Sequence, residues 1–211
     1  MTKTLYLWDM AGTIFHEEWD VKETKYPSIE AWIEAQLGKK IKDVPDRKFE
    51  QMYEIPYKEG WYFQLALQPG AKEVLSWTKY NETFSTGMQE QMDWRAEYLV
   101  PKTGFDFRSC FQKLNSTFDY GETNKKTKEM LVDYLEKKYQ QGYKTVIYTD
   151  DKETNCQFFL EAVKSVKDKY PDFSARLYHI LNNNSGIKDK KTYWEIGSLY
   201  DFLANEKKVS N

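Results

Sequence analysis

The chain has 211 residues, 40% of them hydrophobic, and a formal net charge of −2. That length fits one domain carrying an insert and is long enough to bury a core. The near-neutral charge disfavours a nucleic-acid-binding surface, which would need a basic face. No apolar run reaches the roughly 18 residues of a membrane span, and the apolar stretch before Asp9 is too short for a signal peptide. We therefore expect neither nucleic acid nor membrane as a partner.

Few cysteines and histidines occur, and this restricts the chemistry. Cys110 and Cys156 are too few for a disulfide framework and too far apart for a CxxC metal site. Unpaired thiols predict a reducing, cytoplasmic setting. His16 and His179 are the only histidines, so a three-histidine zinc centre is excluded. We expect a site built from carboxylates, hydroxyls and lysines. The sequence does not indicate an oligomeric state.

The first third of the chain predicts a strand followed by a helical insert. Thr4 to Trp8 is a short apolar run closed by Asp9, which indicates a buried strand ending in a turn. Ser28 opens a helix whose apolar positions lie three to four apart, and Gly38 stops it. We expect a polar stretch over 16–26, a loop over 39–48 and an aromatic, helical stretch over 49–67 interrupted at Pro56.

The remainder of the chain alternates helices with short apolar strands. We expect helices over 71–80, 88–99, 123–141, 154–169 and 198–204, strands over 82–84, 144–148 and 176–181, and weak strand signals over 105–118. Such alternation is typical of a parallel sheet covered on both faces. The predicted fold is therefore α/β, with a Rossmann-like parallel sheet formed by residues 1–15 and 66–211. Residues 16–65 form a small helical insert after the first strand.

Polar residues end three of these predicted strands. Asp9 follows the first strand, Ser85 the second, and Asp150 with Asp151 a later one. Each has an ordinary explanation as a turn residue or helix cap. Because ligands bind outside the carboxyl ends of strands in open parallel sheets, their joint appearance at one edge favours a functional site.

Four motifs in this order resemble the haloacid-dehalogenase-like hydrolase superfamily over most of the chain. The first is Leu-Tyr-Leu-Trp-Asp-Met-Ala-Gly-Thr, residues 5–13, in which the resemblance implies that Asp9 attacks phosphorus. The second is Ser85, within Phe-Ser-Thr-Gly. The third is Lys126 or its neighbour Lys125, and the fourth is Asp150-Asp151 with Asn155. Gln-Pro-Gly-Ala at 68–71 resembles the return from an inserted cap, so residues 16–65 would be that cap.

The resemblance also implies the cofactor and the remaining roles. A Mg²⁺ ion would neutralise the repulsion between a phosphate dianion and the attacking carboxylate. The expected ligands are Asp9, Asp151, the Ala11 backbone carbonyl, and Asp150 either directly or through water. Lys126 would pair with the phosphate and the nucleophile, and Ser85 would donate a hydrogen bond to a phosphoryl oxygen. Substrate-binding roles are expected for Thr13, Thr86, Gly87, Lys125 and His16, and Asn155 would orient Asp150 or Lys126.

One position departs from the family pattern. Family phosphatases carry a second Asp two residues after the nucleophile, which protonates the leaving oxygen and then activates water. Here that position is Ala11. A methyl group cannot transfer a proton, and such assistance is worth roughly 10²–10⁴ in rate.

Three interpretations accommodate Ala11. A group outside the motif substitutes, with candidates His16, Glu17, Lys39, Lys40, Lys42 and Lys48. Alternatively, Asp-x-Ala-Gly-Thr is similar to the phosphonoacetaldehyde hydrolase branch, where a cap lysine forms a Schiff base. In the third, the chain is a catalytically weak binding protein. The sequence favours Mg²⁺-dependent hydrolysis of a small phosphorylated metabolite through an aspartyl-phosphate at Asp9.

Overall fold

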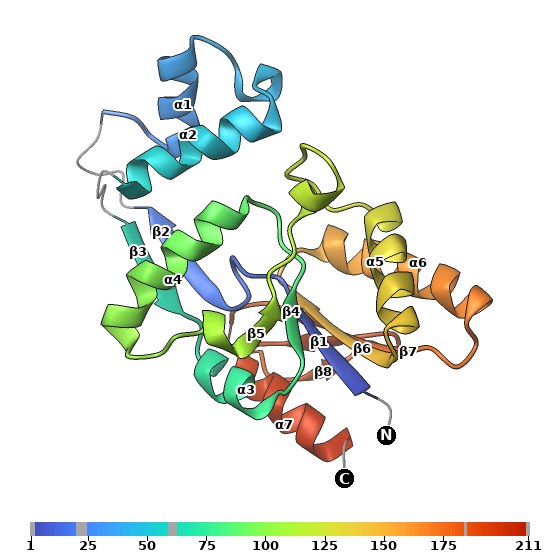
Figure 1. Cartoon of the computed structure of the whole chain (residues 1–211). Helices are drawn as coiled ribbons and strands as arrows, with labels where there is room; N and C mark the ends of the chain where they lie inside the picture. The colour runs from blue at the N-terminus through green and yellow to red at the C-terminus, as the bar shows by residue number, and fades with distance from the viewer. Residues whose placement is uncertain (1–2, 20–24, 59–62, 184, 210–211) are drawn as a thin grey trace.

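The computed structural model describes residues 3–19, 25–58, 63–183 and 185–209 (Figure 1). A seven-stranded sheet with the order β5-β4-β1-β6-β7-β9-β8 forms its centre. The neighbouring strands are parallel except for β8, which runs antiparallel to β9. The strands are β1 Lys3–Trp8, β4 Asn81–Thr83, β5 Phe111–Lys113, β6 Tyr143–Asp150, β7 Ser174–Ile180, β8 Lys188–Asp189 and β9 Trp194–Ile196. The predicted Rossmann-like α/β architecture is confirmed at this level.

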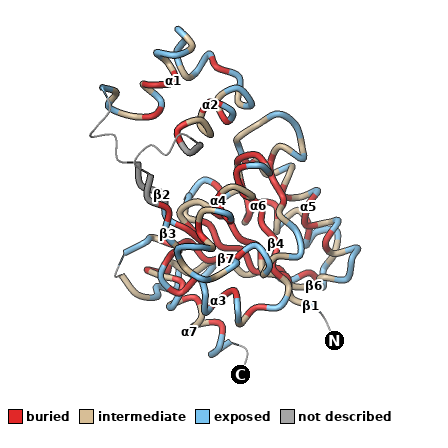
Figure 2. Tube along the Cα trace, turned by 60° about the vertical axis from the view of Figure 1, so that its left-hand side comes forward, coloured by how far each residue is buried: buried red, intermediate tan, exposed pale blue. Residues whose placement is uncertain are grey.

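Helices cover both faces of this sheet. One apolar core joins the sheet to α3, α4 and α7, and a second joins its other face to α5 and α6. Figure 2 shows the buried residues concentrated along the central strands. The helices are α3 Ala71–Trp77, α4 Gln89–Thr103, α5 Lys128–Gln140, α6 Glu153–Lys169 and α7 Leu199–Val209, with short 3₁₀ turns η2 Arg108–Cys110 and η3 Thr117–Tyr120. None of the described helices is long and apolar enough to cross a bilayer.

Strand β1 explains why the sheet is buried on both sides. Its side chains alternate between faces, so Leu5 and Leu7 pack in the core of α5 and α6. Tyr6 and Trp8 belong to the opposite core, where the Trp8 indole donates a hydrogen bond to Asn81 at 2.9 Å. A strand with apolar side chains on both faces is typical of a central parallel strand.

The strand order places a topological switch point at β1. After β1 the chain builds β4 and β5 on one side, then crosses to build β6, β7 and β9 on the other. In open α/β sheets, the crevice outside the carboxyl ends of the strands at such a point is where ligands bind. Asp9 directly follows β1 and Asp150 ends β6, so both lie at this crevice.

A two-stranded antiparallel sheet follows β1 and leads into a separate helical segment. β2 Phe15–Trp19 pairs with β3 Phe63–Leu67. Between them, α1 Ile29–Leu37, η1 Ile41–Asp43 and α2 Asp46–Lys58 form a small core of their own, with Trp32 and Met52 inside it. We call residues 25–58 the α1–α2 segment. It lies beyond the carboxyl ends of the strands, at one end of the molecule (Figure 1).

Several predicted element boundaries are correct and others are wrong. Ser28 caps α1 and Gly38 ends it in a left-handed conformation, as predicted. The helical stretch expected over 49–67 is wrong at its end, because Phe63–Leu67 is a strand, and the polar stretch from residue 16 begins inside β2. Short apolar runs do not distinguish helix from strand by periodicity, and pairing between β2 and β3 decides here. The loop expected over 39–48 contains η1 and the start of α2, and the chain continues through Pro56 as helix.

Candidate active site

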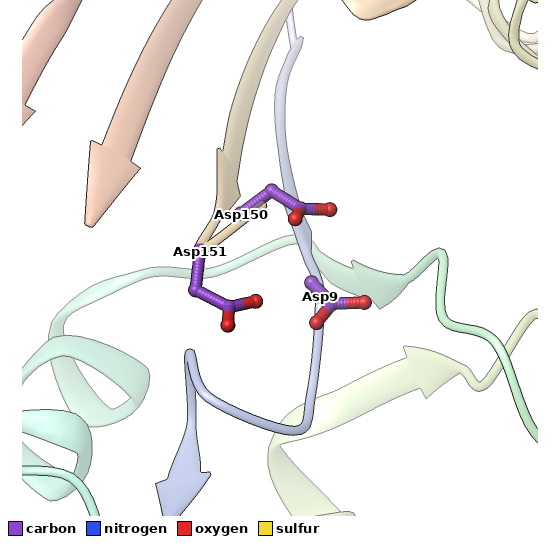
Figure 3. Close-up of side chains that lie close together, drawn as sticks. All are labelled: Asp9, Asp150 and Asp151. Atoms are coloured by element: carbon purple, nitrogen blue, oxygen red, sulfur yellow. The ribbon is translucent and has the colours of Figure 1, made fainter. Parts of the chain in front are cut away.

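Three aspartates gather at the switch point of the sheet. Asp9, Asp150 and Asp151 each offer a carboxylate oxygen, and these oxygens lie within 4.8 Å of one another. Figure 3 shows the three side chains grouped where the chain leaves β1 and β6. Residues separated by about two thirds of the chain thus form one cluster, which is the central expectation from their positions at strand ends.

Backbone pairing fixes the position of this cluster. The Asp9 N–H donates to the Thr149 carbonyl at 2.9 Å, so β1 and β6 stay joined up to their last residues. Gly12 then turns the chain with φ +81°, where a side chain would be strained. A Cβ on Gly12 would lie 2.3 Å from Asp151 Oδ2, so glycine is required for the Asp151 carboxylate to pack against this turn.

Lys126 binds two of the three aspartates. Its Nζ donates to Asp9 Oδ1 at 2.6 Å, to Asp150 Oδ2 at 2.6 Å and to the Tyr148 hydroxyl at 2.9 Å. The Lys126 side chain is 0% exposed, whereas the neighbouring Lys125 is exposed at the surface. Lys126 lies two residues before α5, so the structure brings Lys126, and not Lys125, to the cluster.

Asp150 is held by several further donors. The Asn155 Nδ2 donates to both of its carboxylate oxygens at 3.1 Å, and the Lys152 N–H donates to Oδ1 at 2.8 Å. The Tyr148 hydroxyl also donates to Asp150. Asn155 therefore contacts Asp150, and its role in orienting that carboxylate stays a prediction. These bonds satisfy the Asp150 carboxylate inside the protein.

The acidic cluster has excess negative charge. Lys126, and Lys152 more weakly, face three carboxylates. Burial raises the pKa of Asp9, although Lys126 lowers it and Asp150 raises it further. Burial also raises the pKa of Asp151 to about 7, with the charges of Asp9 and Asp150 adding to the effect. For Lys126, burial lowers the pKa, but the charges of Asp150 and Asp9 outweigh it and hold the pKa above its usual value.

Asp151 shows what kind of group would complete the cluster. Its Oδ1 is buried and has no hydrogen-bond partner among the described residues. A buried carboxylate oxygen without a partner is costly, and a hard divalent cation bound by oxygens removes that cost together with the charge repulsion. The three carboxylates therefore fit a cation of the Mg²⁺ type in ligand chemistry and spacing.

A cavity of about 270 Å³ lies between the α1–α2 segment and the carboxyl ends of the strands. Ala11, Thr86 and Lys152, from the loops after β1, β4 and β6, line it on the sheet side. The other lining residues come mainly from α1, α2 and α4, and comprise Glu30, Phe49, Glu50, Tyr53, Gln91, Arg95 and Asn124. The lining therefore includes Ala11, two residues after Asp9, and Lys152, the residue after Asp151.

Hydrogen bonds accepted by Asp46 and Glu50 help to hold the α1–α2 segment over this cavity. Asp46 Oδ2 accepts hydrogen bonds from the Asn124 N–H at 2.9 Å and from the Thr123 hydroxyl at 3.2 Å. The Gln91 Nε2 donates to Glu50 Oε2 at 2.7 Å. Helix α2 is therefore joined both to α4 and to the loop that precedes Lys126.

The residues expected to bind the phosphate lie near the turns after β1 and β4, and they differ in whether they line the cavity. Ser85 is buried and its hydroxyl donates to the Thr86 carbonyl at 3.2 Å. Gly87 has φ +106°, and the carboxamide of Gln91 lies where its side chain would be. Thr13 is fully buried below the turn, with a hydroxyl that has no partner among the described residues. Only Thr86 of this group lines the cavity.

The described residues that the sequence suggests as replacements for the Asp missing at position 11 lie at the surface of the protein. His16 is exposed on β2 and is not among the residues that line the cavity. The four candidate lysines of the α1–α2 segment are all exposed, and they are Lys39, Lys40, Lys42 and Lys48. Lys40 pairs with Glu34 at 2.9 Å. The side chain of Glu17 lies outside the described part of the structure.

Sequence reasoning missed Tyr148, Lys152, Glu50 and Gln91. Tyr148 belongs to an apolar run, so its hydroxyl carried no signal, and Lys152 resembles any surface lysine. Glu50 and Gln91 lie 41 residues apart in helices of unrelated segments and meet only in the fold. The spacing of Lys152 directly after the Asp pair is the one signal that could have identified a missed residue.

No protein-family model matches this sequence, and no curated protein matches it.

Proposed function

We propose that the chain is a Mg²⁺-dependent hydrolase of small phosphorylated metabolites, acting through an aspartyl-phosphate at Asp9. It would then be a haloacid-dehalogenase-like hydrolase with residues 16–65 as its cap. The observation that carries the proposal is the contact of Asp9 with Lys126, beside Asp150 and Asp151, at the switch point of the sheet. A carboxylate, an ammonium and a cation-binding cluster are the groups that phosphoryl transfer to a carboxylate requires.

The metal ligands proposed are Asp9, Asp151, the Ala11 carbonyl and Asp150, the last directly or through water. Bound there, Mg²⁺ would supply positive charge that lets a phosphate dianion approach an ionised carboxylate. Asp151 Oδ1 supports this assignment because it is buried without a partner among the described residues. Hydrogen bonds from Asn155 and from the Lys152 N–H fix the Asp150 carboxylate, which in turn accepts a hydrogen bond from Lys126. Asp150 would therefore position Lys126 in addition to binding the metal.

The remaining residues bind and orient in this proposal. Lys126 opposes the rise that burial causes in the Asp9 pKa and orients the carboxylate, since its Nζ lies 2.6 Å from Asp9 Oδ1. The hydroxyl of Ser85 and the backbone of Thr86 and Gly87 would donate to phosphoryl oxygens. Thr13 would complete the turn after the nucleophile. These contacts neutralise charge that spreads over the phosphoryl oxygens in the transition state.

The size of the cavity supports a small substrate. A volume of about 270 Å³ lies just below the roughly 300–1,000 Å³ typical of pockets for drug-sized ligands. Its lining mixes charged, amide and aromatic side chains, which suits a polar leaving group. Because α2 contributes to the lining, the α1–α2 segment would select the substrate.

The test is replacement of the nucleophile. Asp9→Asn keeps the size of the side chain and replaces the nucleophilic carboxylate with a neutral amide. Phosphate release from a panel of phosphorylated metabolites in Mg²⁺ should therefore be lost. Asp168→Asn, an exposed carboxylate on α6, is the matched control. Mg²⁺-dependent release that is equal in Asp9→Asn and wild type would refute the proposal.

One alternative retains support. Ala11 lines the cavity at the position where the resemblance leads us to expect an acid. This favours a protein that binds a phosphorylated ligand and hydrolyses it slowly or not at all. Saturable binding of a phosphate ester without turnover would distinguish it. The carbon–phosphorus alternative has less support, because a Schiff-base lysine has to be desolvated. Four lysines of the expected cap, Lys39, Lys40, Lys42 and Lys48, are exposed.

A further inference from the structure

Phosphoryl transfer at Asp9 has a geometric consequence for the missing acid. Nucleophile, phosphorus and leaving oxygen lie roughly in line, so the leaving oxygen points away from Asp9. The cavity of about 270 Å³ lies beyond the carboxyl ends of the strands, and Ala11, which has no acidic group, is among its lining residues. A proton donor for the leaving oxygen therefore has to reach this cavity from a segment other than the loop after β1.

Glu50 is the buried carboxylate in the lining of this cavity. It lies on α2 and is 8% exposed, whereas Glu30, the other carboxylate of the lining, is exposed. The amide of Gln91 fixes its orientation. Gln91 Oε1 accepts from the Met88 N–H at 3.2 Å, which turns Nε2 toward Glu50 Oε2 at 2.7 Å. The Glu50 carboxyl is thus held in one place at the cavity wall.

The surroundings of Glu50 raise its pKa above the usual value for a glutamate. Burial raises the pKa of Glu50 and the nearby Asp46 adds to the rise, while bonds from Gln91 and Asn124 and the charge of Arg95 oppose it. The other titratable groups lining the cavity are Glu30, Tyr53 and Lys152. A carboxyl with a raised pKa can carry a proton to a leaving group near neutral pH.

We propose that Glu50 transfers the protons that an Asp at position 11 would otherwise transfer. In the first step a carboxylate oxygen of Asp9 forms a bond to phosphorus, the bond to the leaving oxygen breaks, and that oxygen takes the proton of Glu50. In the second, water attacks phosphorus from the vacated side and gives its proton to Glu50. The bond to Asp9 then breaks and releases phosphate. This role rests on the proposed function and assigns a catalytic residue to it.

The test compares two leaving groups. Nitrophenolate leaves without a proton, whereas the alkoxide of glycerol phosphate needs one. In Mg²⁺, Glu50→Gln should lower kcat for glycerol phosphate by about 10²–10⁴-fold. With 4-nitrophenyl phosphate it should release one equivalent of nitrophenolate in a burst and then stall, because the phosphorylated enzyme lacks its base. Glu97→Gln, an exposed carboxylate on α4, should behave as wild type.

Two outcomes would overturn the role of Glu50. One is an unchanged kcat for glycerol phosphate, and the other is an equal loss on both substrates with no burst. A thermal unfolding midpoint measured alongside detects a folding defect. Ala11→Asp introduced into Glu50→Gln should then restore turnover of glycerol phosphate, which it would not do for a misfolded chain.

The same assays separate this inference from the function on which it rests. If Asp9→Asn is inactive and Glu50→Gln is unimpaired, Asp9 remains the nucleophile and Glu50 is not the proton carrier. If wild type releases phosphate from neither these esters nor the panel of phosphorylated metabolites in Mg²⁺, or if Asp9→Asn remains active, the proposed function itself fails.

Discussion

Lys126→Met tests the electrostatic account of the site without requiring a substrate. Methionine keeps much of the length of the side chain and removes its charge. In the wild type, Lys126 Nζ lies 2.6 Å from both Asp9 and Asp150, with the lysine and Asp150 side chains 0% exposed. The variant therefore leaves buried carboxylates without their cation and crowded against Asp151.

The expected loss of stability is large. Removing one partner of a buried ion pair costs about 3–5 kcal/mol. For a chain of this length, each kcal/mol shifts the unfolding midpoint by about 2–4 °C. We therefore expect Lys126→Met to unfold roughly 6–20 °C lower than wild type in EDTA at pH 8. Added Mg²⁺ should stabilise the variant more than it stabilises wild type, because the ion replaces the lost positive charge.

The assay is thermal unfolding followed by circular dichroism. Lys125→Met is the matched control, since Lys125 is exposed, and its free energy of unfolding should change by less than about 0.5 kcal/mol. A midpoint for Lys126→Met within about 2 °C of wild type would refute the reasoning, because the ion pairs would then contribute little.

Two further predictions concern Asp151 and Gly12, the residue against which the Asp151 carboxylate packs. Burial, and next the charges of Asp9 and Asp150, raise the pKa of Asp151 to about 7 in the fold, and an unfolded Asp titrates near about 3.9. Between these two pKa values the folded state keeps the Asp151 carboxyl protonated, whereas the unfolded state releases the proton. In EDTA the free energy of unfolding should therefore fall as the pH rises from about 4 to 7. Asp151 contributes at most about 1.4 kcal/mol per pH unit to this fall. A slope in denaturant titrations that survives Asp151→Asn unchanged would contradict this. Gly12→Ala should cost about 1–3 kcal/mol and weaken Mg²⁺ binding, because the new Cβ would lie 2.3 Å from Asp151 Oδ2. Gly38→Ala, with φ +62° and open space around it, controls for backbone strain alone, and an equal effect on Mg²⁺ binding in calorimetry would exclude the clash.

The fold was predictable where the local signals agreed. Ser28 and Gly38 bracket α1, and the apolar run of β1 ending at Asp9 has the signature of a buried parallel strand. Asp9 and Asp150 could be placed together because the carboxyl ends of parallel strands meet at one edge. The grouping of the acidic cluster follows from that rule.

Pairings between distant segments were not predictable. Phe63–Leu67 becomes a strand because β2 pairs with it, and a short apolar run carries no such information. The buried pair of Glu82 and Lys138, with oxygen and nitrogen 2.6 Å apart, joins β4 to α5, although charged residues are usually expected at the surface. Glu50 was missed for the same reason. Its burial depends on how α2 docks against α4, where Gln91 contacts it.

Formation of a covalent phosphoryl group on Asp9 is the step that the proposed function requires most directly. Wild type and Glu50→Gln mixed with 4-nitrophenyl phosphate in Mg²⁺ and quenched in acid within milliseconds to seconds can be digested and analysed by mass spectrometry. We predict one added phosphoryl group on the peptide containing Asp9, more abundant in Glu50→Gln and missing without Mg²⁺. Nitrophenolate release with a phosphoryl group on another residue, or with none on any peptide of either protein, would contradict the assignment of Asp9 as the nucleophile.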